Sequence, residues 1–290
     1  MKHLLCVLGL IVSTVAFAQS LPSETDAKDL YSKRGSDYVN AKKSADMYGQ
    51  LAANAATDSE KAKFLVGQAD ALYFYAVNLA DDDDSEDVLK DSYGIADKAI
   101  SLLEASAGVP KDPADKELLG EAYYTFGANK AKWGSIKGPL TAGPQWSGLA
   151  KRLEIGLKLK PEAGDYGFNR VLGIGHHRVP GWMGADKSAV LPNLKAAYDK
   201  TQVVGPRGRS TSSRIGTTLY LIEYYADKKK KREACDAWKG LKDVIKDAAA
   251  IEALLPEKFP ENKLDADDFN NNPSKEQKEI KTFLKSARCL

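Results

Sequence analysis

The sequence has 290 residues, 43% of them hydrophobic, so it can bury a sizeable core as one or two ordinary domains or as one long repeat array. Its 42 Lys and Arg residues nearly balance its 40 Asp and Glu residues. A near-neutral chain argues against nucleic acid as the natural partner.

The first 18 residues predict a secretory signal peptide. A short polar head precedes an apolar stretch from Leu4 to Phe17, and Ala16-Phe17-Ala18 is a small-x-small cleavage site. The stretch is shorter than the roughly 20 apolar residues that a membrane span needs, and no later segment is apolar enough. We therefore expect a mature chain that begins at Gln19, is exported to the periplasm and has no transmembrane segment.

The cysteines bear on membrane anchoring and on cross-linking. Cys6 lies inside the apolar stretch, whereas a lipid-modified cysteine would stand at the cleavage point, so a lipoprotein is not expected. Cys235 and Cys289 remain after processing, and an oxidising compartment allows a disulfide between them that ties the last helix back to the chain. Two unpaired thiols are the alternative, because sequence does not show how close the two Cα atoms lie.

Helical signals occur throughout the chain, and strand signals are weak. Thr57-x-x-Glu60 is a capping box ahead of an apolar-periodic run. Asp112-Pro113 places a capping acid before a proline at the first helical position, and Ser274-x-x-Gln277 precedes the final helix as a second capping box. The acidic run Asp81 to Asp84 is expected to be a solvated loop between helices. These signals predict an all-α protein.

An aliphatic-glycine pair recurs in four of the expected helices, with the glycines spaced 53, 53 and 43 residues apart. The pairs are Val66-Gly67, Leu119-Gly120, Leu172-Gly173 and Ile215-Gly216. Glycine in mid-helix costs up to about 1 kcal/mol relative to alanine, so its recurrence needs a reason. Close approach of a partner helix is the simplest one.

A second apolar-periodic helix follows each of these helices, and segments 26–34 and 39–56 form an earlier pair. Leu119-Gly120-Glu121-Ala122-Tyr123 matches the Leu-Gly-x-x-Tyr core of a tetratricopeptide first helix. The pattern predicts a tetratricopeptide-like stack of antiparallel helix hairpins, an α-solenoid with long inserted loops. The repeat domain is expected at residues 19–250, with residues 251–290 forming a C-terminal loop and an extra helix that packs on the array.

The segment from Arg170 to Asp186 is the most unusual part of the sequence. A helix is expected to end before Pro180, Gly181-Trp182-Met183-Gly184 to form a turn, and Asp186 to cap the next helix. Such a corner either presents Trp182 at a binding site or packs it on the core.

His176 and His177 are the only histidines after the signal peptide. As neighbours on a helix they point about 100° apart, and no zinc-type spacing surrounds them. They are expected to line a pocket or to make polar packing contacts, without a metal.

Aromatic residues supply the remaining candidate positions. Tyr124 belongs to an aromatic cluster on an expected first helix, and such clusters either line a ligand groove or form the core between repeats; their helical spacing favours the core. Trp133 and Trp146 bound a long insertion and either clamp a ligand or pin the loop.

Enzyme signatures are missing from the sequence: it has no Gly-x-Ser-x-Gly elbow, no phosphate-binding glycine loop and no zinc-protease helix. We therefore expect no catalytic residues, no cofactor and no metal. A hydrolase site near His176, His177 and Asp186 is the alternative, because catalytic groups can converge from distant positions.

The sequence resembles the T component associated with TRAP-type (tripartite ATP-independent periplasmic) transporters, a family of exported tetratricopeptide-like proteins. The resemblance covers roughly residues 25–245. It rests on Leu30-Tyr31-Ser32-Lys33-Arg34-Gly35, on the aromatic helix from Gly120 to Trp133, and on Arg170 with the corner Pro180 to Asp186. Ala185 stands where the family corner has a second glycine, and the lipid-site cysteine common in the family is absent.

The resemblance implies a non-enzymatic periplasmic scaffold, a homo-trimer with a central pore and an apolar groove in each subunit. It would hold a small hydrophobic or carboxylate ligand, or pass it to a periplasmic substrate-binding protein. On this comparison Arg170 neutralises an acid group or holds the corner. The turn beside the groove is shaped by Pro180, Gly181, Trp182, Gly184 and Asp186. A general tetratricopeptide envelope scaffold for a protein or peptide is the second reading.

Overall fold

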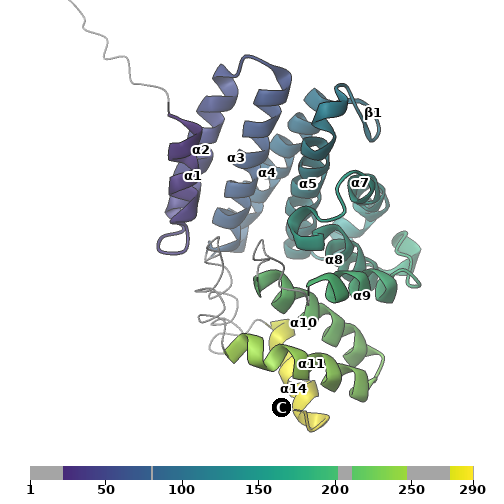
Figure 1. Ribbon diagram of the computed structural model, residues 1–290. Helices are drawn as coiled ribbons and strands as arrows, with labels where there is room; N and C mark the ends of the chain where they lie inside the picture. The colour runs from purple at the N-terminus through teal and green to yellow at the C-terminus, as the bar shows by residue number, and fades with distance from the viewer. Residues whose placement is uncertain (1–21, 80, 202–210, 247–274, 290) are drawn as a thin grey trace, which may run out of the picture.

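The chain folds almost entirely into α-helices, and the prediction of an all-α protein is confirmed (Figure 1). The structure, a computed structural model, describes residues 22–79, 81–201, 211–246 and 275–289. The expected signal peptide and the expected loop at 251–274 lie outside these ranges. The longer helices are α1 (Glu24–Ser32), α2 (Val39–Asn54), α3 (Asp58–Val77), α4 (Asp82–Leu103), α5 (Lys116–Lys137), α7 (Trp146–Leu159), α8 (Ala163–Arg178), α9 (Val190–Thr201), α10 (Thr211–Asp227), α11 (Lys231–Lys246) and α14 (Lys275–Ser286).

Short elements join these helices. Single helical turns are η1 (Pro113–Asp115), α6 (Pro139–Ala142), η2 (Gly143–Gln145) and η3 (Gly181–Met183). Within the described ranges the one sheet is a ribbon in which β1 (Glu104–Ser106) pairs antiparallel with β2 (Val109–Pro110), with Ser106 opposite Val109. The insertion between α5 and α7 is therefore built from helical turns, and the expectation of a long loop there is wrong.

Two of the predicted caps are confirmed, those of Thr57 and Asp112, while the predicted cap at Ser274 lies outside the described residues. The Thr57 hydroxyl accepts a hydrogen bond from the backbone N–H of Glu60 at 3.1 Å, which satisfies a donor that the first turn of α3 leaves free. The run Asp81 to Asp84 does not form a loop as expected. The Asp81 side chain caps α4, and the following acids form its first turn, where carboxylates stabilise the positive end of the helix dipole.

Each helix packs against its neighbour in the chain. Contacts join α1 to α2, α2 to α3, α3 to α4, α4 to α5, α5 to α7, α8 to α9, α9 to α10 and α10 to α11. The helices that carry the recurring glycine, α3, α5, α8 and α10, also contact one another in that order. The final helix, α14, packs on α10 and α11.

The recurring glycine allows close packing in three of its four positions. A Cβ at Gly120 would lie 2.6 Å from the Cβ of Lys160 at the end of α7, and one at Gly173 would lie 2.7 Å from the Leu194 side chain on α9. At Gly67 the neighbour is the Tyr48 ring on α2, at 3.0 Å. A Cβ at Gly216 would have no neighbour within 4 Å among the described residues, so the explanation by close packing is wrong there.

Replacing Gly173 with alanine is expected to destabilise the protein by roughly 1–2 kcal/mol, because Leu194 would have to move away from α8. The matched control is Gly216→Ala, which adds the same methyl group to open space in a helix and should stabilise by up to about 1 kcal/mol. Urea unfolding of the two variants measures both changes. Equal effects of the two substitutions would contradict the packing argument.

The buried apolar residues form two main clusters. The N-terminal cluster is drawn from α1 to α8, with side chains such as Leu103, Leu153 and Phe168 in its interior. The C-terminal cluster is drawn from α9, α10, α11 and α14 and includes Ile222 and Leu284. Figure 1 shows the helices of the C-terminal cluster below those of the N-terminal cluster.

Polar contacts join the two clusters along α8. Asn169 donates to the side-chain oxygen of Asn193 on α9 at 3.0 Å. Ser213 on α10 donates to the carboxylate of Asp165 on α8 at 3.3 Å. In the other direction, the Arg178 guanidinium on α8 donates two hydrogen bonds to the carboxylate of Glu223 on α10. We call this set of contacts the polar seam.

Candidate functional site

The corner between α8 and α9 is fixed by Lys187, which stands shortly before α9 and reaches back to the C-terminal end of α8. The ammonium of Lys187 donates to the backbone carbonyls of His176, His177 and Val179 at 2.8, 2.7 and 2.6 Å. These carbonyls have no hydrogen-bond partner within the helix. A positive charge at this position is also stabilised by the negative end of the α8 dipole. Burial lowers the pKa of Lys187, and the nearby charge of Lys228 acts in the same direction.

His176 holds the corner from the inside. Its Nδ1 accepts a hydrogen bond from the backbone N–H of Asp186 at 2.9 Å and from the indole N–H of Trp146 at 3.3 Å. A nitrogen that accepts carries no proton, so the ring is neutral with its proton on Nε2. Burial lowers the pKa of His176, which favours the same neutral form.

The turn that was expected at Gly181 to Gly184 is present as η3, with Gly184 in the left-handed region at φ +89. The carboxylate of Asp186 accepts hydrogen bonds from the backbone N–H and the hydroxyl of Ser188. It therefore caps the turn ahead of α9 rather than the first residue of that helix. Those hydrogen bonds lower the pKa of Asp186.

His177 points to α10, away from His176. Its Nε2 lies 3.1 Å from a carboxylate oxygen of Asp227 and 3.9 Å from one of Glu223. Burial lowers the pKa of His177, while the two carboxylates oppose that shift. The two histidines thus serve different contacts, and the structure does not bring them together with Asp186 as one group.

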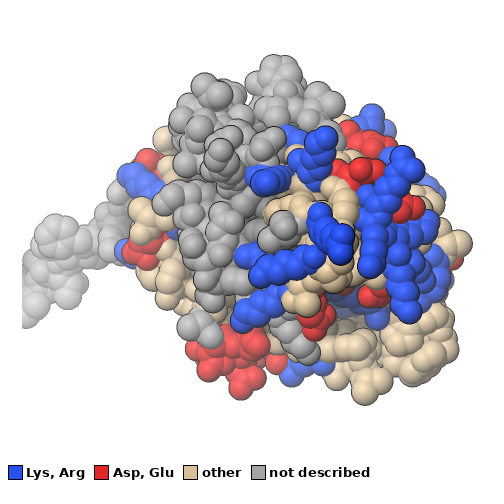
Figure 2. All heavy atoms as spheres, turned by 90° about the horizontal axis from the view of Figure 1, so that it is seen from below, with Lys and Arg blue, Asp and Glu red and all other residues tan. Residues whose placement is uncertain are grey.

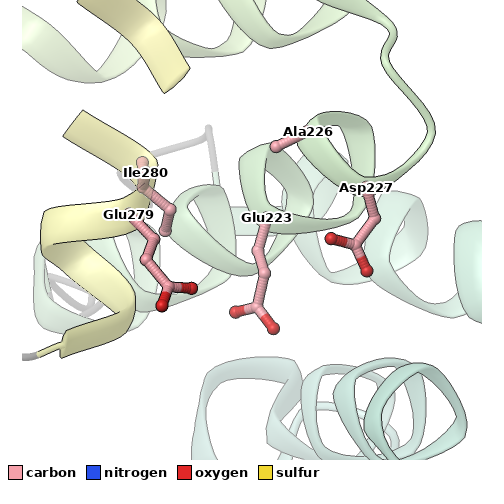
Figure 3. Close-up of a pocket in the computed structure, with 5 residues that line it drawn as sticks. All are labelled: Glu223, Ala226, Asp227, Glu279 and Ile280. Atoms are coloured by element: carbon pink, nitrogen blue, oxygen red, sulfur yellow. The ribbon is translucent and has the colours of Figure 1, made fainter. Parts of the chain in front are cut away.

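A small cavity of about 130 Å³ lies between α10 and α14 (Figure 3). Its lining consists of Glu223, Ala226, Asp227, Glu279 and Ile280. Figure 3 shows the three carboxylates side by side, two from α10 and one from α14. Three carboxylates in the lining oppose the carboxylate ligand that the sequence comparison implies.

Arg170 stabilises the start of α8. Residues Gly164, Asp165 and Tyr166 have positive φ values of 55°, 52° and 60°, a costly conformation for the two residues that are not glycine. The Arg170 guanidinium donates to the carbonyls of Gly164 at 3.2 Å and Asp165 at 3.5 Å, and to the hydroxyl of Thr217 at 3.4 Å. Its hydrogen bonds are therefore directed at the backbone of its own helix and at one side chain of α10.

Tyr124 packs against the same turn. A Cβ at Gly164 would lie 1.9 Å from the Tyr124 ring and one at Gly167 would lie 2.2 Å from it, so only glycine fits beside the ring. The ring also meets Phe168 edge to face, with ring centres 5.5 Å apart. Burial raises the pKa of Tyr124.

The two tryptophans at the ends of the insertion lie in separate packing sites. Trp133 is buried and meets Tyr93 edge to face at 6.0 Å, whereas Trp146 is buried against His176. Both side chains are therefore buried inside the protein at the two ends of the insertion.

Trp182 differs from the other candidates because 79% of its surface is exposed. Leu140, on α6, is 77% exposed. A Cβ at Gly143 would lie 2.1 Å from the sulfur of Met183, so η3, which carries Trp182, contacts η2, the turn that directly follows α6 and Leu140. We call Leu140 and Trp182 the exposed apolar pair. Sequence analysis did not single out Leu140. A leucine that directly follows Gly138-Pro139 in the insertion is the signal that could have indicated an exposed apolar residue.

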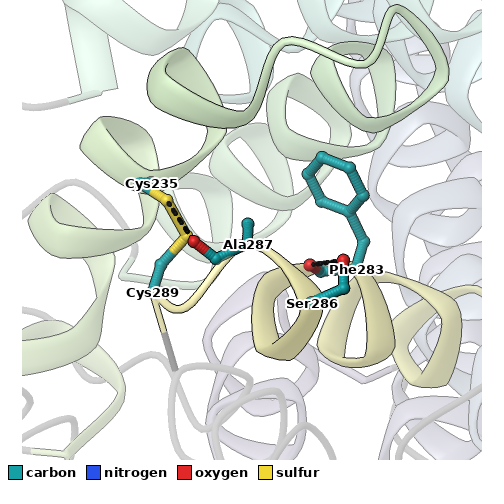
Figure 4. The surroundings of a disulfide bond; sticks show 5 residues. All are labelled: Cys235, Phe283, Ser286, Ala287 and Cys289. Atoms are coloured by element: carbon teal, nitrogen blue, oxygen red, sulfur yellow. Dashed lines mark hydrogen bonds between the residues drawn. A yellow bond between two sulfur atoms is a disulfide. The ribbon is translucent and has the colours of Figure 1, made fainter.

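Cys235 and Cys289 are joined by a disulfide with their Cα atoms 5.4 Å apart (Figure 4). The end of α14 places Cys289 for this bond. Arg288 adopts a left-handed conformation, and the N–H of Cys289 then donates to the carbonyl of Leu284 at 3.0 Å, which is the Schellman arrangement that ends many helices.

Comparisons with known proteins place the chain in no established group. No protein-family model, no curated protein and no solved structure matches it. Among the described helices, none combines the length and the apolar character needed to cross a membrane. No group of three or more His, Cys, Asp or Glu side chains in the described ranges is arranged to hold a metal ion.

Proposed function

We propose that this chain is a non-enzymatic, exported scaffold that docks a protein partner on the exposed apolar pair. The observation that carries the proposal is Trp182, which stands 79% exposed on a corner that Lys187 and His176 hold in place. A large aromatic side chain presented on a fixed turn needs little ordering on binding, and tryptophan is enriched among the residues that dominate binding energy.

The packing of the helices supports a tetratricopeptide-like stack as the scaffold. The glycine-bearing helices contact one another in sequence, and each also packs against the helix that follows it. Three of the four recurring glycines lie where an adjacent helix comes close. Repeats of this kind form extended surfaces that bind other proteins or peptides.

The partner that the resemblance to TRAP T components implies is a periplasmic substrate-binding protein. A direct role in holding a small ligand has less support from the described residues. Arg170, Tyr124, Trp133 and Trp146 are all engaged in internal contacts. The acid-lined cavity of about 130 Å³ is also smaller than the roughly 300–1,000 Å³ of usual ligand sites. In this proposal the substrate-binding protein carries the ligand and the scaffold holds that protein.

We expect a photo-crosslinking residue at position 182 to form an adduct with a substrate-binding protein in the native cell, and the same residue at position 109 to form none. Val109 is the matched control because it is an exposed apolar side chain on β2, away from the corner. With the captured protein purified, Trp182→Ala should weaken binding by about tenfold to 100-fold and Val109→Ala by less than about twofold.

Two outcomes would contradict this proposal. An adduct only between copies of the chain would make the exposed apolar pair a subunit contact of the homo-trimer that the resemblance implies. Equal crosslinking at positions 182 and 109 would mean that the corner is not a binding surface.

A further inference from the structure

Basic side chains lie at the same spacing on two helices of the C-terminal cluster. On α11 they stand at Arg232, Lys239 and Lys242; on α14 they stand at Lys278, Lys281 and Lys285, and Arg288 follows two residues after that helix ends. The three lysines of α14 are spaced i, i+3 and i+7, which places them in one stripe along the helix. The stripe on α11 has the same spacing, with Cys235 at its second position. We call these seven side chains the basic face.

The two stripes belong to one side of the molecule. On both helices the buried residues point the other way, into the C-terminal cluster, as Leu241 does on α11 and Leu284 on α14. The disulfide joins Cys235, which stands within the stripe on α11, to Cys289, which directly follows Arg288. Figure 2, which looks at the molecule from the end where α11 and α14 lie, shows Lys and Arg gathered on that face.

The described side chains leave most of the basic face without an acidic partner. Apart from Lys281, none of its seven members makes an ion pair or hydrogen bond with a side chain that the structure describes, a set that does not include the side chains of residues 243–277. Glu279 lies on another side of α14, where it lines the cavity with Glu223 (Figure 3). Burial lowers the pKa of Lys281, and the charge of Lys285, one helical turn away, acts in the same direction.

We propose that the basic face binds the phosphate headgroups of an anionic membrane surface. Five of its seven members are lysines, which act as point charges and suit a layer of phosphates without fixed geometry. No aromatic residue stands in either stripe, whereas proteins that bind single-stranded nucleic acid stack bases on aromatic rings. The apolar side of α14 is buried in the C-terminal cluster, so the helix lies on the headgroups without inserting.

This binding is electrostatic and independent of the partner proposed for Trp182. It would hold an exported chain at a membrane without a lipid anchor, and it would weaken as salt is added. The exposed apolar pair belongs to α6 and η3 and contributes no residue to the basic face, so failure of one proposal leaves the other standing.

The test is flotation of purified residues 19–290, disulfide intact, with vesicles of phosphatidylcholine alone or of equal parts phosphatidylcholine and phosphatidylglycerol. Binding is expected only to the anionic vesicles and should disappear at high salt. The variant Lys239→Glu/Lys278→Glu/Lys285→Glu should bind at least about 100-fold more weakly, since each basic residue near such a surface contributes roughly a fivefold factor and three such factors multiply.

The matched control is Lys43→Glu/Lys61→Glu/Lys98→Glu, which reverses three exposed lysines on α2, α3 and α4 and changes the net charge equally. It should bind within about threefold of the natural chain, and circular dichroism checks that both variants fold. Equal binding by the two variants, or equal binding to neutral vesicles, would overturn the proposal. Tighter binding to a DNA duplex than to anionic vesicles, at equal phosphate concentration, would overturn it in favour of a nucleic acid.

Discussion

Replacing Cys235 and Cys289 with serine is expected to lower the free energy of unfolding of the C-terminal cluster by about 4 kcal/mol. The disulfide closes a loop between residues 54 apart in sequence, and a link over that distance removes much of the conformational freedom of the unfolded chain. It also attaches α14, whose Ile280 and Leu284 are buried in that cluster. Without the bond, α14 should open more often than the helices that it covers.

Urea unfolding and limited proteolysis measure this effect. The natural protein treated with a reducing agent is the first control, because it should match the double variant. The second control is Cys6→Ser, which alters the cysteine of the expected signal peptide and should leave the unfolding of the mature chain unchanged. An unfolding midpoint of the double variant equal to that of the oxidised natural protein would show that the disulfide does not hold α14 in place.

Replacing Arg170 with methionine is expected to destabilise the protein by roughly 2–3 kcal/mol. The substitution keeps much of the side-chain volume but removes the donors that bind the carbonyls of Gly164 and Asp165 and the hydroxyl of Thr217. Charged hydrogen bonds of this kind contribute about 1.5–3 kcal/mol each at best, and these three are long, so the sum is modest. The left-handed residues at the start of α8 would lose the contacts that hold them.

Arg178→Met is the matched control for this substitution. It removes an arginine from the same helix, but the ion pair between Arg178 and Glu223 is partly exposed. Ion pairs of that kind contribute about 0–1 kcal/mol to the free energy of unfolding. Arg170→Lys should recover only part of the loss, because an ammonium cannot reach all three acceptors at once. Equal effects of Arg170→Met and Arg178→Met in urea unfolding would mean that Arg170 does not support the turn.

Much of the helical organisation could be predicted because its signals are local. A capping hydroxyl such as that of Thr57 acts within one turn, and an apolar period reports which side of a helix is buried. The insertion after α5 was misjudged because Gly138-Pro139 and Gly143-Pro144 are typical of loops, yet proline is also favoured in the first turn of a short helix. Gly216 was misjudged because the sequence does not show whether another helix reaches it.

The candidate site was harder to predict because its character depends on contacts between distant residues. Sequence identified Arg170, His176 and Trp146 as unusual, but only the fold shows that His176 accepts from Trp146 and that Arg170 binds its own helix. The basic face could have been found from the spacing of charges on α11 and α14. Its two stripes are separated by 36 residues and become one surface only when the helices pack.

The polar seam has a consequence for how the sequence can change. Most buried apolar side chains belong to one cluster or the other, although Leu194 packs on Gly173 across the seam. A substitution such as one at Leu153 therefore disturbs neighbours that differ from those of Leu284. Free-energy changes at well-separated positions usually add, whereas those within one packed cluster do not. The helices below the seam can therefore diverge together, as one evolutionary module, while the packing of the helices above it is retained.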